Sequence, residues 1–441
     1  MADIKKKILL LSTGDVNGAY EYVYKLAFLL NKQGHKVVML VKNKTKPDDF
    51  VIQYQRLYKF QNKKGLLVRV FLKIKNRLLP VKKNQIFFDD KYYFFSADEK
   101  SVNISAEQVI KQIGFIPEFV FSGMTSDYMN STDLLSLQQL TKSQIYNITV
   151  DMNHFTGGCH FAWDCNGYVN GCHVNCPAII SKEGKELAEI NFETKFKNAK
   201  SGNFKIITGS DWTLQQAKKS KIYKNQSSIL NVNSLIDTKI LNNKSRAYAK
   251  DIFNMDVNKF YILMGCQYTT DKRKGFDYLL EALQILDNKI STEQKERIEV
   301  IIVSHLVLKS FNDIPFQKKH LDYIKDYRLL SLLYQATDVF VNSSIEDSGP
   351  MMVSEALACG TPVVGFDMGI VNNMVINDYN GYKAKLKDST DLANGIKTIL
   401  ELSKQEYNQY SLNAVTQVEE FSSFEYADKV LSEILNSESS D

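Results

Sequence analysis

The stretch of sequence that decides the fold is SSIEDSGPMMVSEALACGTPVVG, residues 343–365. The run that starts at Met351 predicts a helix after a glycine-containing loop, and the apolar residues 362–366 predict a buried strand. A loop, a helix and a buried strand in this order are typical of an α/β sheet. Asp347 then lies in the loop and Glu355 in the helix, so we expect both carboxylates to face a ligand at the helix N-terminus.

The start of this helix is a candidate anion site. Gly349 lets the backbone approach a ligand closely, and Pro350 starts a helix without losing a useful donor. The amides of Met351 and Met352 point out of the first turn, where N–H groups lack intrahelical acceptors and the helix dipole is positive. We expect the amides to bind a diphosphate and the carboxylates a polyhydroxylated group. A helix cap followed by a core strand is the alternative without a ligand.

The same stretch resembles the acidic pair of the retaining glycosyltransferases of sequence family four. Their pattern is an acidic residue, seven residues of any type and a Glu, followed by small residues and Gly-Thr-Pro-Val-Val. Asp347 and Glu355 match the acidic pair, with Asp in place of the more usual Glu, and Glu346 is a neighbouring alternative. The resemblance implies that Asp347 binds the donor sugar and Glu355 the nucleotide ribose. The remaining matches are Ala356, Gly360, Thr361, Pro362, Val363 and Val364.

A basic motif, DKRKG at residues 271–275, precedes a predicted helix. In the same family a Lys in this setting contacts the donor diphosphate, and Lys274 matches it. A second basic residue usually stands a few positions earlier, just after a glycine, but here Gly265 is followed by Cys and Gln. The second basic contact to the diphosphate is therefore either missing or supplied by Lys272 or Arg273. Solvation of an exposed basic run is the alternative.

The alternation of apolar segments predicts two successive α/β domains. The resemblance implies the GT-B fold, in which two facing Rossmann-like domains enclose a cleft. We expect an acceptor-side domain at residues 1–190 and a nucleotide-sugar domain at residues 200–420. We also expect residues 424–441 to form a helix that crosses back to the first domain. Gly18, in the first strand-to-helix loop, matches the family's first glycine loop and is expected to approach the donor phosphates or the acceptor.

Four of the six cysteines lie between residues 151 and 177, among glycines and polar residues. In a cytosolic protein such a cluster more often binds a metal than forms disulfides, and four thiolates suit a structural zinc ion. An iron–sulfur cluster is an alternative, and so is replacement of one thiolate by His160 or His173. Residues 156–160 also resemble a TGGCH subgroup of bacterial surface-polysaccharide glycosyltransferases. The candidate zinc ligands are Cys159, Cys165, Cys172 and Cys176.

Asp151 is a candidate catalytic residue in this segment. Related enzymes commonly carry a His immediately before this Asp, near the reacting sugar, but here the position holds Val150. We expect Asp151 to orient the acceptor hydroxyl or the charge that develops on the sugar. His154 and His160 are further polar candidates, although a lone His is usually a structural residue.

Positive charge is concentrated in an insertion at residues 44–100. Between Lys42 and Lys91, fourteen Lys or Arg stand against four Asp or Glu, so a local balance of +10 exceeds the net charge of +5. Apolar positions within residues 67–78 fall on one helical face. Such a helix suits an anionic membrane surface, where each cation contributes about 1 kcal/mol. A helix that packs on its own domain is the alternative. The flanking cations are Arg69, Lys73, Lys75 and Arg77.

Composition and length predict a globular protein that is made and kept in the cytosol, either free or at the inner face of the membrane. The hydrophobic content of 44% and the charged content of 24% are ordinary for such proteins. The apolar run at residues 8–11 is too short for a signal peptide, and no segment approaches the roughly 20 apolar residues that cross a bilayer. No nucleic-acid-binding motif accompanies the basic insertion, so nucleic acid is not an expected partner.

These features together predict a retaining glycosyltransferase that moves a hexose from a nucleotide diphosphate sugar to a saccharide acceptor. The resemblance implies a lipid-linked intermediate of a bacterial capsule, O-antigen or exopolysaccharide as the acceptor. It also implies that no cofactor and no divalent metal are needed at the reacting phosphate. Two alternatives stay open. One is a catalytically impaired glycan-binding subunit, and the other is a nucleotide-sugar epimerase of the same two-domain shape.

Overall fold

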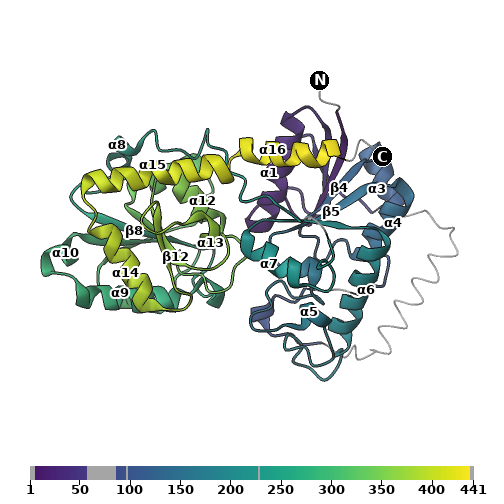
Figure 1. Ribbon diagram of the computed structural model, residues 1–441, viewed down its shortest axis with the longest axis horizontal. Helices are drawn as coiled ribbons and strands as arrows, with labels where there is room; N and C mark the ends of the chain where they lie inside the picture. The colour runs from purple at the N-terminus through teal and green to yellow at the C-terminus, as the bar shows by residue number, and fades with distance from the viewer. Residues whose placement is uncertain (1–4, 57–85, 96–97, 227–228, 438–441) are drawn as a thin grey trace, which may run out of the picture.

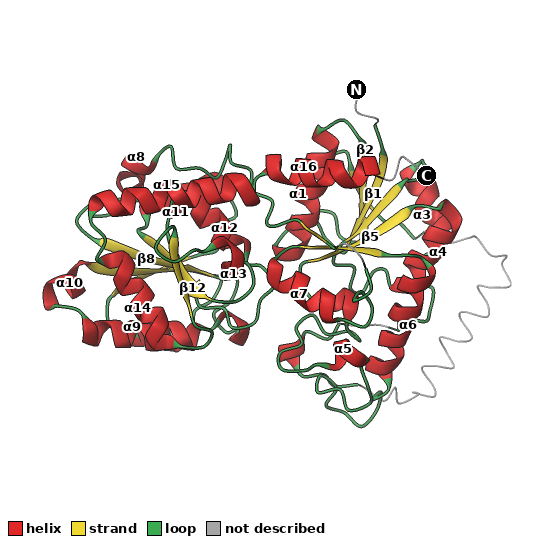
Figure 2. Ribbon diagram, viewed as in Figure 1, coloured by secondary structure: helices red, strands yellow, loops and turns green. Residues whose placement is uncertain are grey.

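The computed structural model describes residues 5–56, 86–95, 98–226 and 229–437. Figure 1 shows two lobes, each built around one sheet, and Figure 2 shows helices on both sides of the strands. Every strand pair in both sheets is parallel. Parallel sheets with helices on both faces are the Rossmann-like arrangement, so the prediction of two such domains is confirmed.

The first sheet has the strand order β3-β2-β1-β4-β5-β6-β7 among the described residues. Its strands are apolar because both faces are covered by helices, and four consecutive residues of β1, from Ile8 onward, are fully buried. The strands are β1 (Lys7–Ser12), β2 (Lys36–Val41), β3 (Val51–Gln53), β4 (Phe119–Ser122), β5 (Gln144–Thr149), β6 (Lys205–Thr208) and β7 (Leu230–Asn231). The larger helices around it are α1 (Gly18–Lys32), α3 (Ala106–Ile113), α4 (Ser131–Thr141), α6 (Leu187–Ser201) and α7 (Asp211–Lys219).

Short helical turns shape the loops of the first lobe, at η1 (Asp90–Tyr92), η2 (Asn153–Phe155) and α5 (Gly167–Asn170). Strands β6 and β7 extend the first sheet beyond β5. Residues 205–231 therefore belong by sheet membership to the first lobe, whereas the boundary expected from the sequence lay between residues 190 and 200.

The second sheet has the order β10-β9-β8-β11-β12-β13 in the described part of the chain. Its strands are β8 (Phe260–Gly265), β9 (Ile298–Val303), β10 (Gln317–Leu321), β11 (Val339–Asn342), β12 (Val363–Phe366) and β13 (Gly381–Ala384). Its helices are α8 (Arg246–Ile252), α9 (Phe276–Lys289), α10 (Thr292–Arg297), α11 (Tyr327–Ala336), α12 (Met351–Ala358), α13 (Val371–Met374), α14 (Ser389–Leu400) and α15 (Lys404–Phe421). Two further turns, η3 (Lys272–Lys274) and η4 (Lys309–Asp313), lie in its loops.

The last helix, α16 (Phe424–Ser437), returns to the first lobe and lies beside α1 (Figure 1). Phe424, Leu431 and Leu435 are buried in the same apolar cluster as residues of β1 and α1. Burying each such side chain contributes about 1.5–3 kcal/mol relative to exposure. The C-terminal segment therefore ties the two lobes together.

None of the described helices is long and apolar enough to cross a membrane. The basic amphipathic helix expected at residues 67–78 lies outside the described residues.

Candidate active site

The loop that follows β11 is bonded directly to η3. The amide of Ile345 donates to the Arg273 carbonyl at 2.8 Å, and the hydroxyl of Ser343 donates to the Lys274 carbonyl at 2.9 Å. Gly275 permits this close approach, because it has a φ of +64° and an added Cβ would lie 1.9 Å from the Ser343 carbonyl oxygen. The basic motif at residues 271–275 and the acidic stretch that starts at residue 343, about 70 residues apart in the sequence, therefore form one surface.

Two cations converge on Asp347 in this surface. Lys274 Nζ lies 2.5 Å from Asp347 Oδ2, and Arg273 Nη1 lies 4.0 Å from the same oxygen. Burial raises the pKa of Asp347, but Lys274 and Arg273 outweigh it, and the net pKa is below the usual value. Asp347 is therefore an ionised, nearly buried carboxylate with two cations beside it.

Arg273 occupies an aromatic setting supplied by the first lobe. Its guanidinium lies 3.9 Å from the ring centre of Phe161 and 4.7 Å from that of Tyr93, and its Nη2 donates to Asp271 at 2.5 Å. Cation–π contacts of this kind favour a fixed, charged guanidinium. Arg273 thus stands as a second cation next to Lys274, in place of the basic residue expected after Gly265.

Glu346, the neighbouring carboxylate, is bonded to the first lobe. Its Oε1 accepts the backbone N–H of Trp163, in the first lobe, at 3.1 Å. Burial, followed by the charge of Asp347, raises the pKa of Glu346 to about 7. Asp347 is therefore the carboxylate that forms ion pairs with Lys274 and Arg273, whereas Glu346 accepts a backbone N–H and senses the charge of Arg273.

Glu355 lies inside α12, as the spacing predicts, and is 3% exposed. Its Oε2 accepts the hydroxyl of Tyr334 at 3.0 Å. Burial raises the pKa of Glu355, and the charge of Lys25, on α1 of the first lobe, opposes that rise. Glu355 is thus placed where the two lobes meet.

Lys25 is the residue at this site that the sequence reasoning missed. Its side chain is 8% exposed and its Nζ lies 4.7 Å from the ring centre of Tyr327, on α11 of the second lobe. Burial lowers the pKa of Lys25, and the charges of Glu355 and Glu21 oppose that change. One sequence feature could have identified Lys25: it is a cation placed between the apolar positions Val23 and Leu26 of α1, both of which are buried.

The loop before α12 lies against the first lobe, where an added Cβ at Gly349 would lie 3.6 Å from the carbonyl oxygen of Gly209. Helix α12 begins at Met351, so the amides of Met351 and Met352 are in its first turn. Asp347 Oδ1 accepts the amide of Gly349 at 3.2 Å. The Met352 side chain packs over Gly265, where an added Cβ would lie 1.9 Å from the Met352 methyl carbon.

Ser348 joins this loop to the first lobe. Its hydroxyl donates to the carbonyl of Val150, and its own carbonyl accepts the hydroxyl of Ser210. Asp151 therefore lies one residue from a direct contact with the Asp347 loop.

Asp151 starts a chain of hydrogen bonds in the first lobe. Its Oδ2 lies 2.8 Å from His160 Nδ1, and His160 Nε2 lies 3.0 Å from the Ser126 hydroxyl. Burial raises the pKa of Asp151, but His160 outweighs it, and the net pKa is low. His154 donates from Nε2 to the Gly123 carbonyl at 3.0 Å, and burial lowers its pKa to about 4. His154 is therefore neutral at physiological pH, and His160 orients Ser126.

Gly18 is the first residue of α1 and has a φ of +46°, which favours glycine. An added Cβ would meet no atom within 4 Å, so the helix start is open on that side. Among the residues that the structure describes, no hydrogen bond or ion pair joins Gly18 to another predicted site residue.

The four clustered cysteines line one small cavity of about 10 Å³, together with Tyr92 and Phe94. All are free thiols, and burial raises the pKa of three of them, Cys159, Cys172 and Cys176. Within the described ranges, no group of three or more His, Cys, Asp or Glu is arranged to hold a metal ion. The predicted zinc site is therefore not confirmed. The sequence spacing was right about proximity but did not define the orientation of the thiols.

Two facing Rossmann-like lobes, with acidic and basic side chains gathered where they meet, define the GT-B class of fold. Residues 249–416 match the family model described as "Glycosyl transferases group 1". The second lobe is thus a glycosyltransferase group 1 domain. It contains Asp347, Glu355 and Lys274.

Curated relatives agree with this assignment. An uncharacterized glycosyltransferase of Haemophilus influenzae is 25% identical over 137 residues, 29% of this chain and 36% of the relative. The N,N'-diacetylbacillosaminyl-diphospho-undecaprenol alpha-1,3-N-acetylgalactosaminyltransferase of Campylobacter jejuni is 34% identical over 95 residues, 19% of this chain and 25% of the relative. The chain therefore aligns with well under half the length of either relative.

A solved structure supports the fold over the whole chain. The structure of Anabaena HepE in complex with UDP and glucose has a TM-score of 0.61 and covers 99% of this chain and 100% of its own. At 13% sequence identity this likeness shows the fold alone.

Proposed function

We propose that the chain is a retaining glycosyltransferase that moves a hexose from a nucleotide diphosphate sugar to a saccharide acceptor. The observation that carries the proposal is the convergence of Lys274 and Arg273 on Asp347, next to the N-terminus of α12. Cations and helix amides suit a diphosphate, and a carboxylate at the same place suits sugar hydroxyls. The glycosyltransferase group 1 match over residues 249–416 supports the same reading.

The proposed mechanism is positioning and charge stabilisation. Lys274, Arg273 and the amides of α12 bind the diphosphate and stabilise the charge that it gains as the bond to the sugar breaks. Glu355 binds the ribose, and Asp347 orients the donor sugar. The acceptor hydroxyl attacks from the face that the diphosphate leaves, and the leaving diphosphate takes the proton. No protein base is then needed, which is consistent with Val150 at the position of the family's His.

We propose Asp151 as the residue that orients the acceptor. Its carboxylate is ionised and held by His160, and it adjoins the Val150 carbonyl that bonds to Ser348. In this position it can also stabilise positive charge that develops on the sugar.

The proposed acceptor is a lipid-linked intermediate of a bacterial surface glycan. Support comes from the name of the Campylobacter jejuni relative, whose acceptor is a diphospho-undecaprenol sugar, and from the TGGCH resemblance at residues 156–160. The basic insertion suits association with an anionic membrane surface at the cytosolic side. A structural zinc ion at the four cysteines is kept as a hypothesis because the thiols share one cavity, and it has no part in the proposed reaction.

A screen of nucleotide sugars with membrane-extracted acceptors, read by mass spectrometry, tests the proposal. We expect one nucleotide sugar to be consumed, with a hexose added to the acceptor and free nucleoside diphosphate released. Slow hydrolysis of that donor without acceptor would further support a transferase. A product still attached to the nucleotide would indicate an epimerase instead, and binding of glycans without consumption of any donor would indicate a glycan-binding subunit.

A further inference from the structure

A cavity of about 430 Å³ lies within the first lobe, on the side of the sheet covered by α4 and α6. Its wall includes residues that follow β4 and β5, at the carboxyl edge of the sheet, where ligands of such folds collect. The volume is within the range of small-molecule sites. None of the roles assigned above to the donor uses this cavity. Among its wall residues are Thr125, Ser126, Asn130, Ser131, Asn147 and Asn153.

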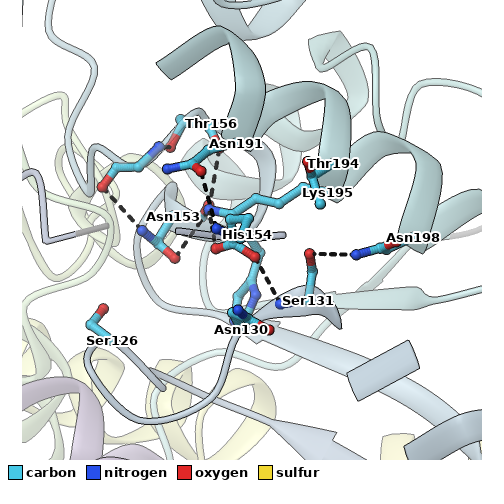
Figure 3. Close-up of polar contacts among 12 residues, drawn as sticks. Ser126, Asn130, Ser131, Asn153, His154, Thr156, Asn191, Thr194, Lys195 and Asn198 are labelled. Carbon is cyan, nitrogen blue, oxygen red and sulfur yellow. Dashed lines mark hydrogen bonds and ion pairs between the residues drawn. The ribbon is translucent and has the colours of Figure 1, made fainter. Parts of the chain in front are cut away.

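The wall is rich in hydroxyl and amide groups, and the described residues place no unpaired charge in its interior. Lys195 Nζ donates to the Asn153 carbonyl at 2.8 Å and to the Thr156 carbonyl at 3.3 Å (Figure 3). It also pairs with Glu99 Oε1 at 3.6 Å. Glu99 Oε2 accepts the amide of Ser131 at 2.8 Å. The buried cation Lys195 thus has its hydrogen bonds satisfied and its charge neutralised, which disfavours a phosphate or carboxylate as the ligand.

Two polar atoms at the wall lack a partner. Tyr128 Oη and Asn147 Oδ1 belong to side chains that are 7% and 4% exposed, and neither atom has a hydrogen-bond partner among the residues that the structure describes. A buried polar group without a partner costs free energy, so a ligand rich in hydroxyls would be favoured here over an apolar one.

The cavity is linked to the candidate active site. Ser126 is part of the wall, and His160 connects its hydroxyl to Asp151. His154, on the same wall, donates to the Gly123 carbonyl, and burial and the charge of Lys195 lower its pKa. A ligand in the cavity would therefore lie at one end of a hydrogen-bonded chain whose other end is the proposed acceptor-orienting carboxylate.

We propose that this cavity binds one neutral, hydroxyl-rich sugar unit of the acceptor. The inference rests on the proposed function, because it takes the ligand of the first lobe to be a saccharide. Beyond the proposed function, the inference states where the saccharide binds and that the bound sugar unit is uncharged. The exposed charges Lys42, Arg56 and Asp127 lie on the wall outside this neutral interior and are left to contact the rest of the acceptor.

Saturation-transfer NMR with the full chain tests the proposal, with glucose, galactose, N-acetylglucosamine and N-acetylgalactosamine at millimolar concentration as probes and glycerol as the negative control. We expect saturation transfer to at least one sugar and none to glycerol. Asn103→Trp should weaken the binding of that sugar at least about tenfold, because the wall residue Asn103 is exposed and its side chain forms no hydrogen bond with the described residues that the change would break. Asn31→Trp, an exposed position on α1 away from the cavity, is the matched control and should bind normally.

Tyr128→Phe is the second variant. It removes a hydroxyl that has no hydrogen-bond partner in the described part of the chain, so thermal stability should not fall, and sugar affinity should drop about 3- to 10-fold. Tyr410→Phe, a buried tyrosine of the second lobe, controls for the loss of a hydroxyl elsewhere.

Three outcomes would overturn the proposal. They are absence of saturation transfer to all four sugars, equal binding in the wild type and both cavity variants, and a signal that survives in Asn103→Trp but disappears in Lys274→Ala. The last would place the sugar in the donor site. Binding of UDP, GDP and ADP to the wild type, measured in parallel, tests the proposed function separately. If no nucleotide binds while a sugar still occupies the cavity, the transferase proposal fails and the sugar site stands.

Discussion

Removing the Lys274 ammonium should weaken binding of the nucleoside diphosphate more than any change to its neighbours in η3. In the structure, Lys274 Nζ lies 2.5 Å from Asp347 and its side chain is about one-fifth exposed, so it is ready to contact a diphosphate at the start of α12. A hydrogen bond to a charged group contributes about 1.5–3 kcal/mol, which corresponds to about 10- to 150-fold in Kd.

Arg273 limits the loss of nucleotide affinity that we expect in Lys274→Ala. Its Nη1 stays 4.0 Å from Asp347, and the rings of Phe161 and Tyr93 hold it there, so one of the two cations is kept in Lys274→Ala. We therefore expect a loss near the lower end, about 10- to 30-fold, with turnover falling in parallel.

Isothermal titration calorimetry with the diphosphate that binds the wild type measures this effect. Lys272→Ala is the matched control, because Lys272 lies in the same turn and is exposed. Lys274→Arg keeps the charge and should recover part of the affinity. The reasoning is refuted if Lys274→Ala binds the nucleotide as tightly as the wild type, or if Lys272→Ala loses as much affinity.

Three further predictions concern other parts of the chain. The folded-state pKa of Glu346, about 7, lies above its ordinary value, so its favourable contribution is complete at low pH and is lost as pH rises through 7. Relative to Glu346→Gln, the wild type should therefore lose up to about 3 kcal/mol of unfolding free energy between about pH 5 and pH 8, and parallel denaturation profiles would contradict this. If the cysteine cluster binds zinc, elemental analysis should find close to one zinc per chain, less in Cys159→Ser; a metal-free protein of full thermal stability would exclude it. If the basic segment at residues 67–78 binds lipid, the protein should sediment with anionic vesicles at low salt and be released at high salt, and equal recovery with neutral vesicles would rule this out.

The sequence by itself determined the class of fold and pointed to Asp347, Glu355 and Lys274 as the charged residues of the candidate site. The run from the loop of Asp347 to the strand at residues 362–366 carries local signals, namely a glycine turn, a helix start and an apolar strand, and each acts within a few residues. For the same reason the eight-residue spacing placed Glu355 inside the helix that begins at Met351. Local spacing also identified the four clustered cysteines as neighbours around one cavity, although it did not orient their thiols for a metal.

Only the tertiary structure decided which side chains meet across the two lobes. The sequence does not distinguish Glu346 from Asp347 as the carboxylate of the site. In the structure Glu346 accepts the backbone N–H of Trp163, in the first lobe, and Asp347 accepts a hydrogen bond from Lys274. Arg273 is held beside Asp347 because the rings of Tyr93 and Phe161, far away in the sequence, pack on its guanidinium. Lys25 contacts Tyr327 because α1 of the first lobe packs against α11 of the second. These contacts depend on how separate elements pack against one another, and that arrangement is set by the whole core and not by any local pattern of residues.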